Sequence, residues 1–176
     1  TTAVEEKMAA LDTLVQQGKV RYVGCSNYSA WHIMKSQMAA QQASGVKFVT
    51  QQIHYTLEAR EAEYELLPLA VDQNLGVQVW SPLAAGLLTG KHRRGGAVPK
   101  DSRQAAGWNE PPIRDMERLW KIVDCLVEIA DAHGATPAQV ALAWLLTRPA
   151  ISSLVIGGRT EAQFTENFAA LSLTCL

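Results

Sequence analysis

Four short apolar segments that alternate with helical segments constrain the fold of this chain more than any other feature. The apolar segments are rich in β-branched and aromatic residues and cover residues 20–25, 48–53, 77–81 and 152–157. Short apolar strands separated by helices are typical of parallel βα units whose strands are covered by helices on at least one face. Two architectures fit, a doubly wound open sheet and a (β/α)₈ barrel, of which four units make half.

The segments between these strands have helical periodicity and recognisable helix ends. We expect helices in residues 4–17, 29–44, 62–73, 116–133, 137–148 and 160–171. Residues 136–139 (TPAQ) predict a capping box with proline at the first helical position, and Thr160 with Gln163 predicts a second box. Pro68 falls inside the third helical segment, where we expect a kink or an irregular turn. The polar and glycine-rich residues 92–112 predict a long loop.

Two phosphate-binding motifs deserve comparison with this pattern, and neither is complete. No strand is followed by GxGxxG, which disfavours an open dinucleotide-binding sheet relative to a barrel. Gly90 and Lys91 resemble the end of a P-loop. However, Ala85 and His92 stand where that motif needs glycine and then serine or threonine.

Composition excludes several classes of function. With 176 residues, 48% hydrophobic content and a formal net charge of −1, the chain suits one sizeable core and has no basic surplus for nucleic acid. No apolar run reaches the length of a membrane span, and the first residues (TTAVEEKMAAL) lack the features of a signal peptide. The three cysteines and four histidines fall at no spacing typical of disulfide frameworks or metal sites. We therefore expect a soluble cytoplasmic protein that binds no metal.

Polar and aromatic residues follow each predicted strand, at the edge where parallel βα folds bind ligands. These positions are residues 26–27, 52–55, 80–83 and 157–160, and they include no carboxylate pair. Their amides suit a carboxamide, and Trp80 offers a flat face to a heteroaromatic ring. Arg159 beside a capped helix N-terminus suits a phosphate monoester. Together they predict a site for a dinucleotide that carries an extra phosphate.

The chain resembles the aldo-keto reductases, in particular the broad group related to bacterial oxidoreductases and potassium-channel β subunits. The matching segments are ALDTLVQQGKVRYVGCSNYSAW, QQIHYTLEAREAEYELLPLAVDQNLGVQVWSPLAAGLLTGK and TPAQVALAWLLTRPAISSLVIGGRTEAQFTEN, in the family's order and spacing over nearly the whole chain. The resemblance implies an enzyme with a (β/α)₈ barrel, an NADP-dependent oxidoreductase. Such an enzyme uses NADPH and no metal to reduce small-molecule aldehydes or ketones by hydride transfer.

The resemblance also implies a role for each residue of a cofactor site. From the nicotinamide to the adenosine end, the matching positions are Ser26, Asn27, Gln52, Trp80, Ser81, Leu83, Gly86, Lys91, Gly157, Arg159, Gln163 and Asn167. The first three correspond to residues that hold the nicotinamide carboxamide, and Trp80 corresponds to the aromatic residue that stacks on its ring. The next four correspond to the segment along the pyrophosphate. The last four correspond to the adenosine end, where Arg159 is expected to give a preference for the 2′-phosphate of NADP.

The match begins at the helix before the family's fifth barrel strand, so the chain resembles the C-terminal half alone, strands five to eight. The family's catalytic Asp, Tyr, Lys and His lie on the first four strands. We therefore assign a catalytic role to no residue, including Tyr22, Tyr28, Tyr55 and Tyr64. Residues 1–176 are expected to form a single partial domain, a fragment that binds NADPH and by itself reduces little or no carbonyl compound. An alternative is a non-catalytic nucleotide-binding or regulatory module that pairs with another chain.

A half-barrel has an unpaired edge at its first and at its last strand. Such edges leave backbone groups open, and we expect apolar side chains that face the barrel interior to be uncovered as well. This surface is expected to pair either with a separate N-terminal half or with a second copy of the chain in a homodimer. We favour the homodimer for the isolated chain.

Overall fold

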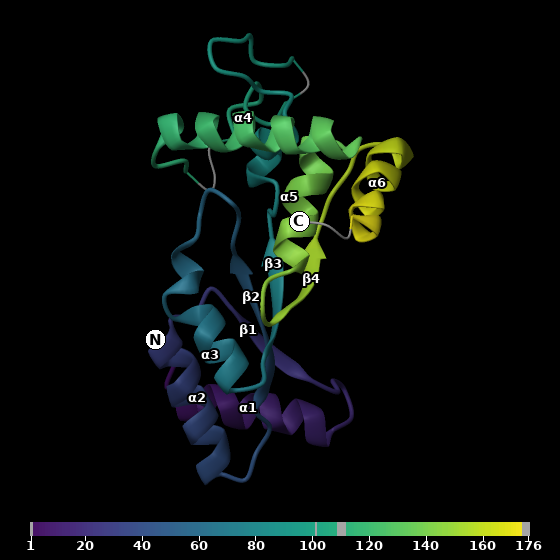
Figure 1. Cartoon of the computed structure of the whole chain (residues 1–176). Helices are drawn as coiled ribbons and strands as arrows, with labels where there is room; N and C mark the ends of the chain where they lie inside the picture. The colour runs from purple at the N-terminus through teal and green to yellow at the C-terminus, as the bar shows by residue number, and fades with distance from the viewer. Residues whose placement is uncertain (1, 101, 109–111, 174–176) are drawn as a thin grey trace.

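The computed structural model describes residues 2–100, 102–108 and 112–173 and contains a four-stranded parallel sheet (Figure 1). The strands are β1 (Val23–Ser26), β2 (Phe48–His54), β3 (Gly76–Trp80) and β4 (Ile151–Val155). They are hydrogen-bonded in sequence order, and each neighbouring pair is parallel. Successive parallel strands that are also neighbours in space match part of a (β/α)₈ barrel, so the predicted fold class is confirmed.

Helices connect these strands. The α-helices are α1 (Val4–Gln16), α2 (Ala30–Gln42), α3 (Leu66–Asp72), α4 (Met116–His133), α5 (Pro137–Leu146) and α6 (Glu161–Phe168). Short 3₁₀ helices lie at Glu61–Glu63, Ala84–Thr89 and Ala169–Ser172. In Figure 1, α1 and α2 lie at the lower end of the view, whereas α4 crosses the upper end. Within the described residues, no helix is long and apolar enough to cross a membrane.

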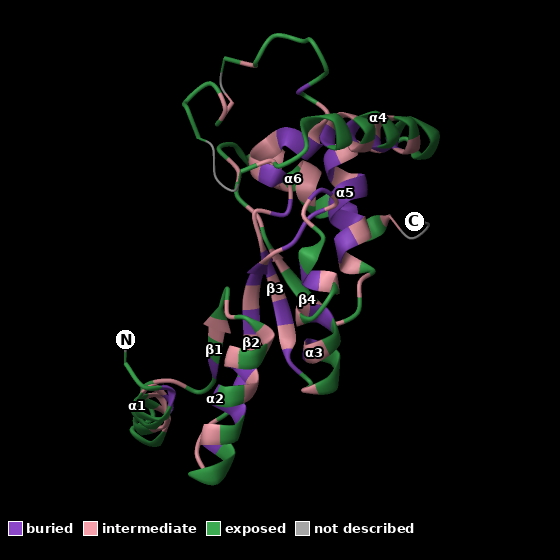
Figure 2. Ribbon diagram, turned by 90° about the vertical axis from the view of Figure 1, so that its left-hand side faces the viewer, coloured by how far each residue is buried: buried purple, intermediate pink, exposed green. Residues whose placement is uncertain are grey.

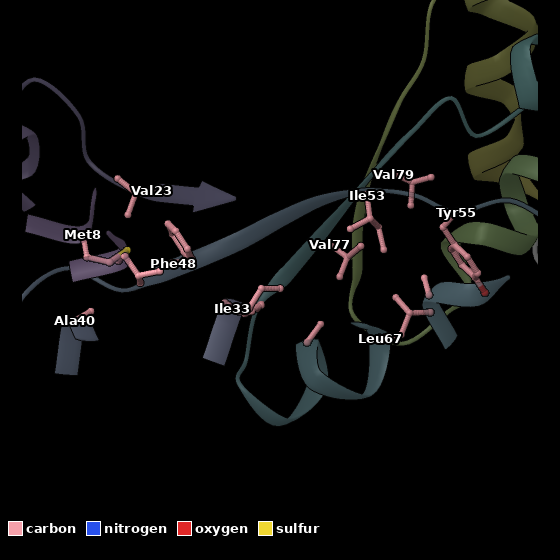
Figure 3. Close-up of a cluster of buried hydrophobic side chains, with 14 of the residues drawn as sticks. Met8, Val23, Ile33, Ala40, Phe48, Ile53, Tyr55, Leu67, Val77 and Val79 are labelled. Carbon is pink, nitrogen blue, oxygen red and sulfur yellow. The ribbon is translucent and has the colours of Figure 1, made fainter. Parts of the chain in front are cut away.

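One face of the sheet is buried beneath helices. The buried strand residues on this face are Val23, Phe48, Ile53, Val77 and Val79. They pack in one cluster with side chains from α1, α2, α3 and α5, namely Val4, Met8, Ile33, Ala40, Leu67, Ala70 and Leu145, most of which are drawn in Figure 3. Alternate burial along a strand follows from its two-residue repeat. The helix-facing side of the sheet therefore holds the main core.

A second apolar cluster holds α4 against the chain that follows β3. The buried face of α4 consists of Leu119, Val123, Leu126 and Ala130. These side chains pack against the 3₁₀ segment Ala84–Thr89 and against α5. They form the amphipathic stripe that the sequence predicts, and Gly134 ends the helix in the left-handed conformation with φ 60°.

The opposite face of the sheet is less buried and mostly polar. Strand register aligns four residues in one row across all four strands, and we call Ser26, Gln52, Gln78 and Ser153 the polar row. None of the four is buried, and Figure 2 shows the alternation of buried and less buried residues along β3. The expectation of uncovered apolar side chains is therefore wrong for most of this face, which presents hydrogen-bonding groups instead.

Two boundaries differ from the sequence expectations. β1 begins at Val23 rather than at residue 20, because its partner strand β2 begins at Phe48, opposite Val23. Pro68 is the third residue of α3, and a 3₁₀ turn and a break precede that helix. An N–H in the first helical turn has no intrahelical acceptor, so proline fits there without a kink.

The two predicted capping boxes form differently. The box at Thr136 is complete, with hydrogen bonds in both directions between Thr136 and Gln139. At α6, Thr160 Oγ1 accepts from Gln163 N–H at 3.3 Å as predicted. Gln163 Oε1, however, accepts from Arg159 N–H at 2.7 Å, so the return bond is shifted by one residue.

The complete box at Thr136 gives a testable contribution to stability. Thr136 Oγ1 accepts from Gln139 N–H at 3.3 Å, and Gln139 Oε1 accepts from Thr136 N–H at 2.9 Å. We expect Thr136→Ala to lower the free energy of unfolding by about 1 kcal/mol, because the substitution leaves a helical N–H without its partner. Urea unfolding followed by circular dichroism measures this change. Thr13→Ala in α1, where the exposed hydroxyl bonds to Ala9 O, is the control and should change the value by less than about 0.5 kcal/mol; equal losses would contradict the prediction.

Candidate functional site

Four of the predicted site residues meet at the carboxyl ends of β1, β2 and β3. Ser26 is the register partner of Gln52, and Asn27 N–H donates to Gln52 O at 3.0 Å. Trp80 Nε1 donates to Asn27 Oδ1 at 3.0 Å, a contact between residues that are 53 positions apart in the chain. The parallel order of the strands is what gathers these side chains at one edge.

The bond from Trp80 fixes which end of the Asn27 amide remains available. An indole N–H can only donate, so the amide oxygen of Asn27 must face it. The Nδ2 group of Asn27 is left as a donor. The backbone at Asn27 is left-handed, with φ 53°, a conformation that asparagine adopts more readily than most residues. The site therefore offers a hydrogen-bond donor at the end of β1.

A second amide contact lies within the polar row. Gln52 Nε2 donates to Gln78 Oε1 at 3.1 Å. This bond leaves Gln52 Oε1 as an acceptor. Sequence reasoning missed Gln78, although a polar residue between the two buried residues Val77 and Val79 is a readable signal.

The Trp80 ring also has an aromatic neighbour. The His54 and Trp80 ring centroids are 4.7 Å apart, with an interplanar angle of 36°. Burial lowers the pKa of His54 below its ordinary value, and the Glu61 carboxylate opposes this effect more weakly. An imidazole with a lowered pKa is neutral at pH 7. The two rings therefore give the site an uncharged aromatic wall.

Left-handed backbone conformations gather in the segment that follows β3. Ser81, Ala84, Ala85 and Gly86 have φ values of 52°, 49°, 56° and 97°. The three non-glycine residues among them are strained, and such residues cost about 1–3 kcal/mol each and cluster at ligand sites. Ser81 Oγ accepts from Ala85 N–H at 3.3 Å and closes the turn. A Cβ on Gly86 would meet no atom within 4 Å, so the positive φ rather than crowding favours glycine there.

The two other predicted residues of this segment lie apart from the strand ends. Leu83 packs against the α4 cluster. Lys91 is exposed, and no hydrogen bond joins its side chain to another predicted site residue in the part of the chain that the structure describes. Gly90 packs closely on Pro137, because a Cβ there would lie 2.7 Å from Pro137 Cγ. Gly90 and Lys91 thus end a 3₁₀ helix and do not form a P-loop.

The predicted residues after β4 lie around the start of α6. Trp80 and Val155 are register partners, so the chain leaves β4 beside the segment that follows β3. Gly157 and Arg159 are exposed, and Arg159 immediately precedes the N-cap residue Thr160. Gln163 and Asn167 are four positions apart, which places them on one face of α6.

Among the described residues, neither a metal centre nor an acid–base pair occurs at these strand ends. No group of three His, Cys, Asp or Glu side chains there could hold a metal ion. The buried Tyr55 hydroxyl donates to Glu63 Oε1 at 2.6 Å. Burial, and then this hydrogen bond, raise the pKa of Tyr55. Burial raises the pKa of the Cys25 thiol to about 11. The arrangement is chemically suited to holding a planar amide, an aromatic ring and an anion.

Comparison with known proteins assigns the chain to a family. The sequence model of the Aldo/keto reductase family matches residues 1–175. The chain belongs to the aldo/keto reductase family. The resemblance inferred from the sequence is thereby confirmed.

Curated members related to this aldo/keto reductase chain align with nearly all of it. An uncharacterized oxidoreductase of Bacillus subtilis, YrpG, is 37% identical over 173 residues, which are 98% of this chain and 51% of the relative. A probable voltage-gated potassium channel subunit beta of Arabidopsis thaliana is 36% identical over 176 residues, with 98% of this chain and 53% of the relative covered. Versiconal hemiacetal acetate reductase of Aspergillus parasiticus is 33% identical over 179 residues, with coverages of 98% and 50%. The chain spans about half the length of the curated relatives it matches.

The structure of this aldo/keto reductase chain also adds residues from the loop at 92–112. Residues 101 and 109–111 of that loop lie outside the described residues, and its described parts contain no helix or strand. Gln104 Nε2 donates to Ala85 O at 3.3 Å, and Arg103 Nη2 would lie 3.9 Å from a Cβ placed on Gly157. The loop therefore reaches both segments that follow β3 and β4. No local sequence signal marks Arg103, because its neighbours at the site are distant in the chain.

Proposed function

We propose that this chain is the NADPH-binding half of an aldo/keto reductase that reduces aldehydes or ketones by hydride transfer. The observation that carries the proposal is the hydrogen-bonded group of Asn27, Gln52 and Trp80 at the carboxyl ends of three parallel strands. A nicotinamide bound there would supply the hydride. The work of these residues would be to bind its carboxamide and to orient one face of its ring.

The hydrogen-bonding pattern supports a carboxamide as the ligand group. Asn27 has a donor available, because its oxygen already accepts from Trp80 at 3.0 Å. Gln52 has an acceptor available, because its nitrogen already donates to Gln78 at 3.1 Å. A primary carboxamide carries one acceptor oxygen and one donor nitrogen, so it complements this pair. The half-buried Trp80 indole would cover one face of the adjoining ring.

The segments after β3 and β4 support a phosphate-bearing ligand beyond the ring. Near Gly86 the backbone stays open to close approach, since no heavy atom lies within 4 Å of a Cβ placed there. The first N–H groups of α6 and the adjoining Arg159 together favour a phosphate monoester. We therefore propose that the 2′-phosphate of NADPH binds beside Arg159, with Gln163 and Asn167 near the adenosine.

Within the described residues, no tyrosine is set up to protonate a substrate at this site. Tyr55 is buried and bonded to Glu63, and Tyr22 and Tyr64 are exposed on the surface. Tyr28 accepts a hydrogen bond from Lys7 at 3.3 Å, and it packs against the helix-covered core rather than on the polar face. We propose that the proton donor comes from a second half of the barrel.

The open edge of β1 supports pairing with such a second half. A cavity of about 430 Å³ lies between α1 and β1, and it is lined by Lys7, Met8, Ala10, Leu11, Leu14, Gly24, Cys25, Ser26, Tyr28, Ser36 and Phe48. Among the residues that the structure describes, no strand pairs with this edge of β1, so its backbone groups are open to pairing. We propose that an N-terminal half, or a second copy of the chain when it is alone, covers this edge.

Titration with NADPH, followed by tryptophan fluorescence, tests the proposed function. We expect saturable quenching, because the nicotinamide ring would lie against Trp80, one of five tryptophans in the chain. Trp80→Phe should lose most of the quenching. Trp31→Phe, which changes an exposed residue of α2, should keep it. Absence of saturable quenching in the unaltered chain would contradict the proposal.

A non-catalytic nucleotide-binding or regulatory module is the second candidate function. It is favoured by the relatives described as potassium channel β subunits and by the absence of an acid–base pair among the described site residues. Both candidates require the same cofactor contacts. They differ in whether carbonyl reduction appears once the barrel is complete.

A further inference from the structure

Gln78 lies at the centre of the polar row. It is not one of the residues predicted from the sequence to contact a cofactor. Its register partners are Gln52 on β2 and Ser153 on β4. Its neighbours along β3, Val77 and Val79, are fully buried on the other face. A glutamine at this position adds nothing to the core. Its side-chain oxygen accepts a hydrogen bond from Gln52 Nε2 at 3.1 Å.

In the structure, this bond holds the Gln52 amide in one of its two orientations. A glutamine amide can present either its NH₂ donor or its oxygen acceptor after a rotation of its terminal torsion, because the two ends are nearly equal in shape. With Nε2 held by Gln78, the Gln52 group left available is the acceptor. The Asn27 amide is fixed in the opposite sense, because Trp80 Nε1 occupies its oxygen.

We propose that Gln78 is a positioning residue that makes the site selective for a carboxamide over a carboxylate on the cofactor ring. This inference rests on the proposed function, since it requires the nicotinamide end to lie against Gln52 and Asn27. A carboxylate has two acceptor oxygens and no donor, so it would meet the acceptor of Gln52 unfavourably. When Gln78 is replaced by an apolar residue, the Gln52 amide becomes free to turn its NH₂ group toward that carboxylate.

Three ligands and three variants separate this role from a structural one. The ligands are NADP⁺, nicotinic acid adenine dinucleotide phosphate, which carries the carboxylate, and 2′,5′-ADP, which lacks the nicotinamide end. The variants are Gln78→Leu, Gln78→Glu and the control Ser153→Ala, which removes the polar neighbour on the side away from Gln52. Isothermal titration calorimetry gives each Kd, and thermal melting checks that each variant folds.

We expect Gln78→Leu to weaken NADP⁺ binding about fivefold and to leave 2′,5′-ADP binding unchanged, as one lost orienting hydrogen bond implies. The preference for carboxamide over carboxylate should narrow in Gln78→Leu. It should persist or widen in Gln78→Glu, because a carboxylate still accepts from Gln52 Nε2. Ser153→Ala should match the unaltered chain.

Two results would overturn the inference while the proposed function stands. One is an unchanged ratio of the two dinucleotide Kd values in Gln78→Leu, and the other is an equal loss of all three ligands in a folded variant. If the unaltered chain binds neither NADP⁺ nor 2′,5′-ADP, the proposed function fails and this inference fails with it.

Discussion

Replacement of Arg159 by alanine is expected to raise the Kd for NADPH about 30-fold while changing the Kd for NADH less than about twofold. The two cofactors differ in the 2′-phosphate alone. An arginine that binds this group contributes charge-assisted hydrogen bonds, which are stronger than neutral ones. The expected effect is therefore confined to the cofactor that carries the phosphate.

The setting of Arg159 explains why the effect should be large for one residue. It directly precedes the N-cap of α6, where Thr160 Oγ1 accepts from Gln163 N–H and the first N–H groups of the helix lie. Arg159 N–H donates to Gln163 Oε1 at 2.7 Å, which ties the residue's backbone to the helix. A phosphate there would meet a guanidinium and the positive end of a helix dipole together.

Arg21→Ala is the matched control for this substitution. Arg21 is an exposed arginine just before β1, at the amino ends of the strands and thus at the edge opposite the candidate site. Its replacement removes the same charge from the chain, so a general electrostatic effect would appear in both variants. An equal loss of NADPH and NADH in Arg159→Ala would remove Arg159 from the 2′-phosphate site, and fluorescence titration at fixed ionic strength measures both.

Local signals in the sequence were enough to predict the elements of the fold. The strand at β3 and the helix at α4 follow directly from apolar periodicity, and Gly134 marks the end of α4. The capping box at Thr136 also depends on neighbours within one helical turn. Two details differed. The start of β1 depends on its partner strand, which is a non-local constraint. The bond that Gln163 Oε1 was expected to accept from Thr160 N–H comes from Arg159 N–H instead, one residue away.

The polarity of the sheet face that carries the polar row could not be predicted from strand composition alone. The apolar residues of each segment predicted a strand, whereas the polar row becomes visible when register places Gln78 beside Gln52. The same holds for the site. Strand ends were predictable from the βα pattern, whereas Arg103 reaches Gly157 through a loop whose path no periodicity specifies.

Carbonyl turnover by this chain alone is expected to be at least about 10⁴-fold below the roughly 10 s⁻¹ of a typical enzyme. Hydride addition to a carbonyl leaves an alkoxide that needs a proton. Among the described residues, the tyrosine hydroxyls are bonded elsewhere or exposed, and burial raises the pKa of Tyr55. A general acid contributes about 10²–10⁴ in rate, and an open polar face also loses the water exclusion and substrate positioning of a closed barrel.

Consumption of NADPH with a reactive aromatic aldehyde measures this turnover against the rate without protein. In the informative comparison, the chain is mixed with the part of Bacillus subtilis YrpG that it does not cover. This part exists because the alignment spans 51% of that relative. A rate that rises on addition, and that Trp80→Ala abolishes, would support a reductase completed by its other half. A rate that stays at background despite complex formation would favour the regulatory module, because cofactor binding would then occur without chemistry. Turnover near 10 s⁻¹ by the chain alone would contradict both, since the proton donor would have to lie within these residues.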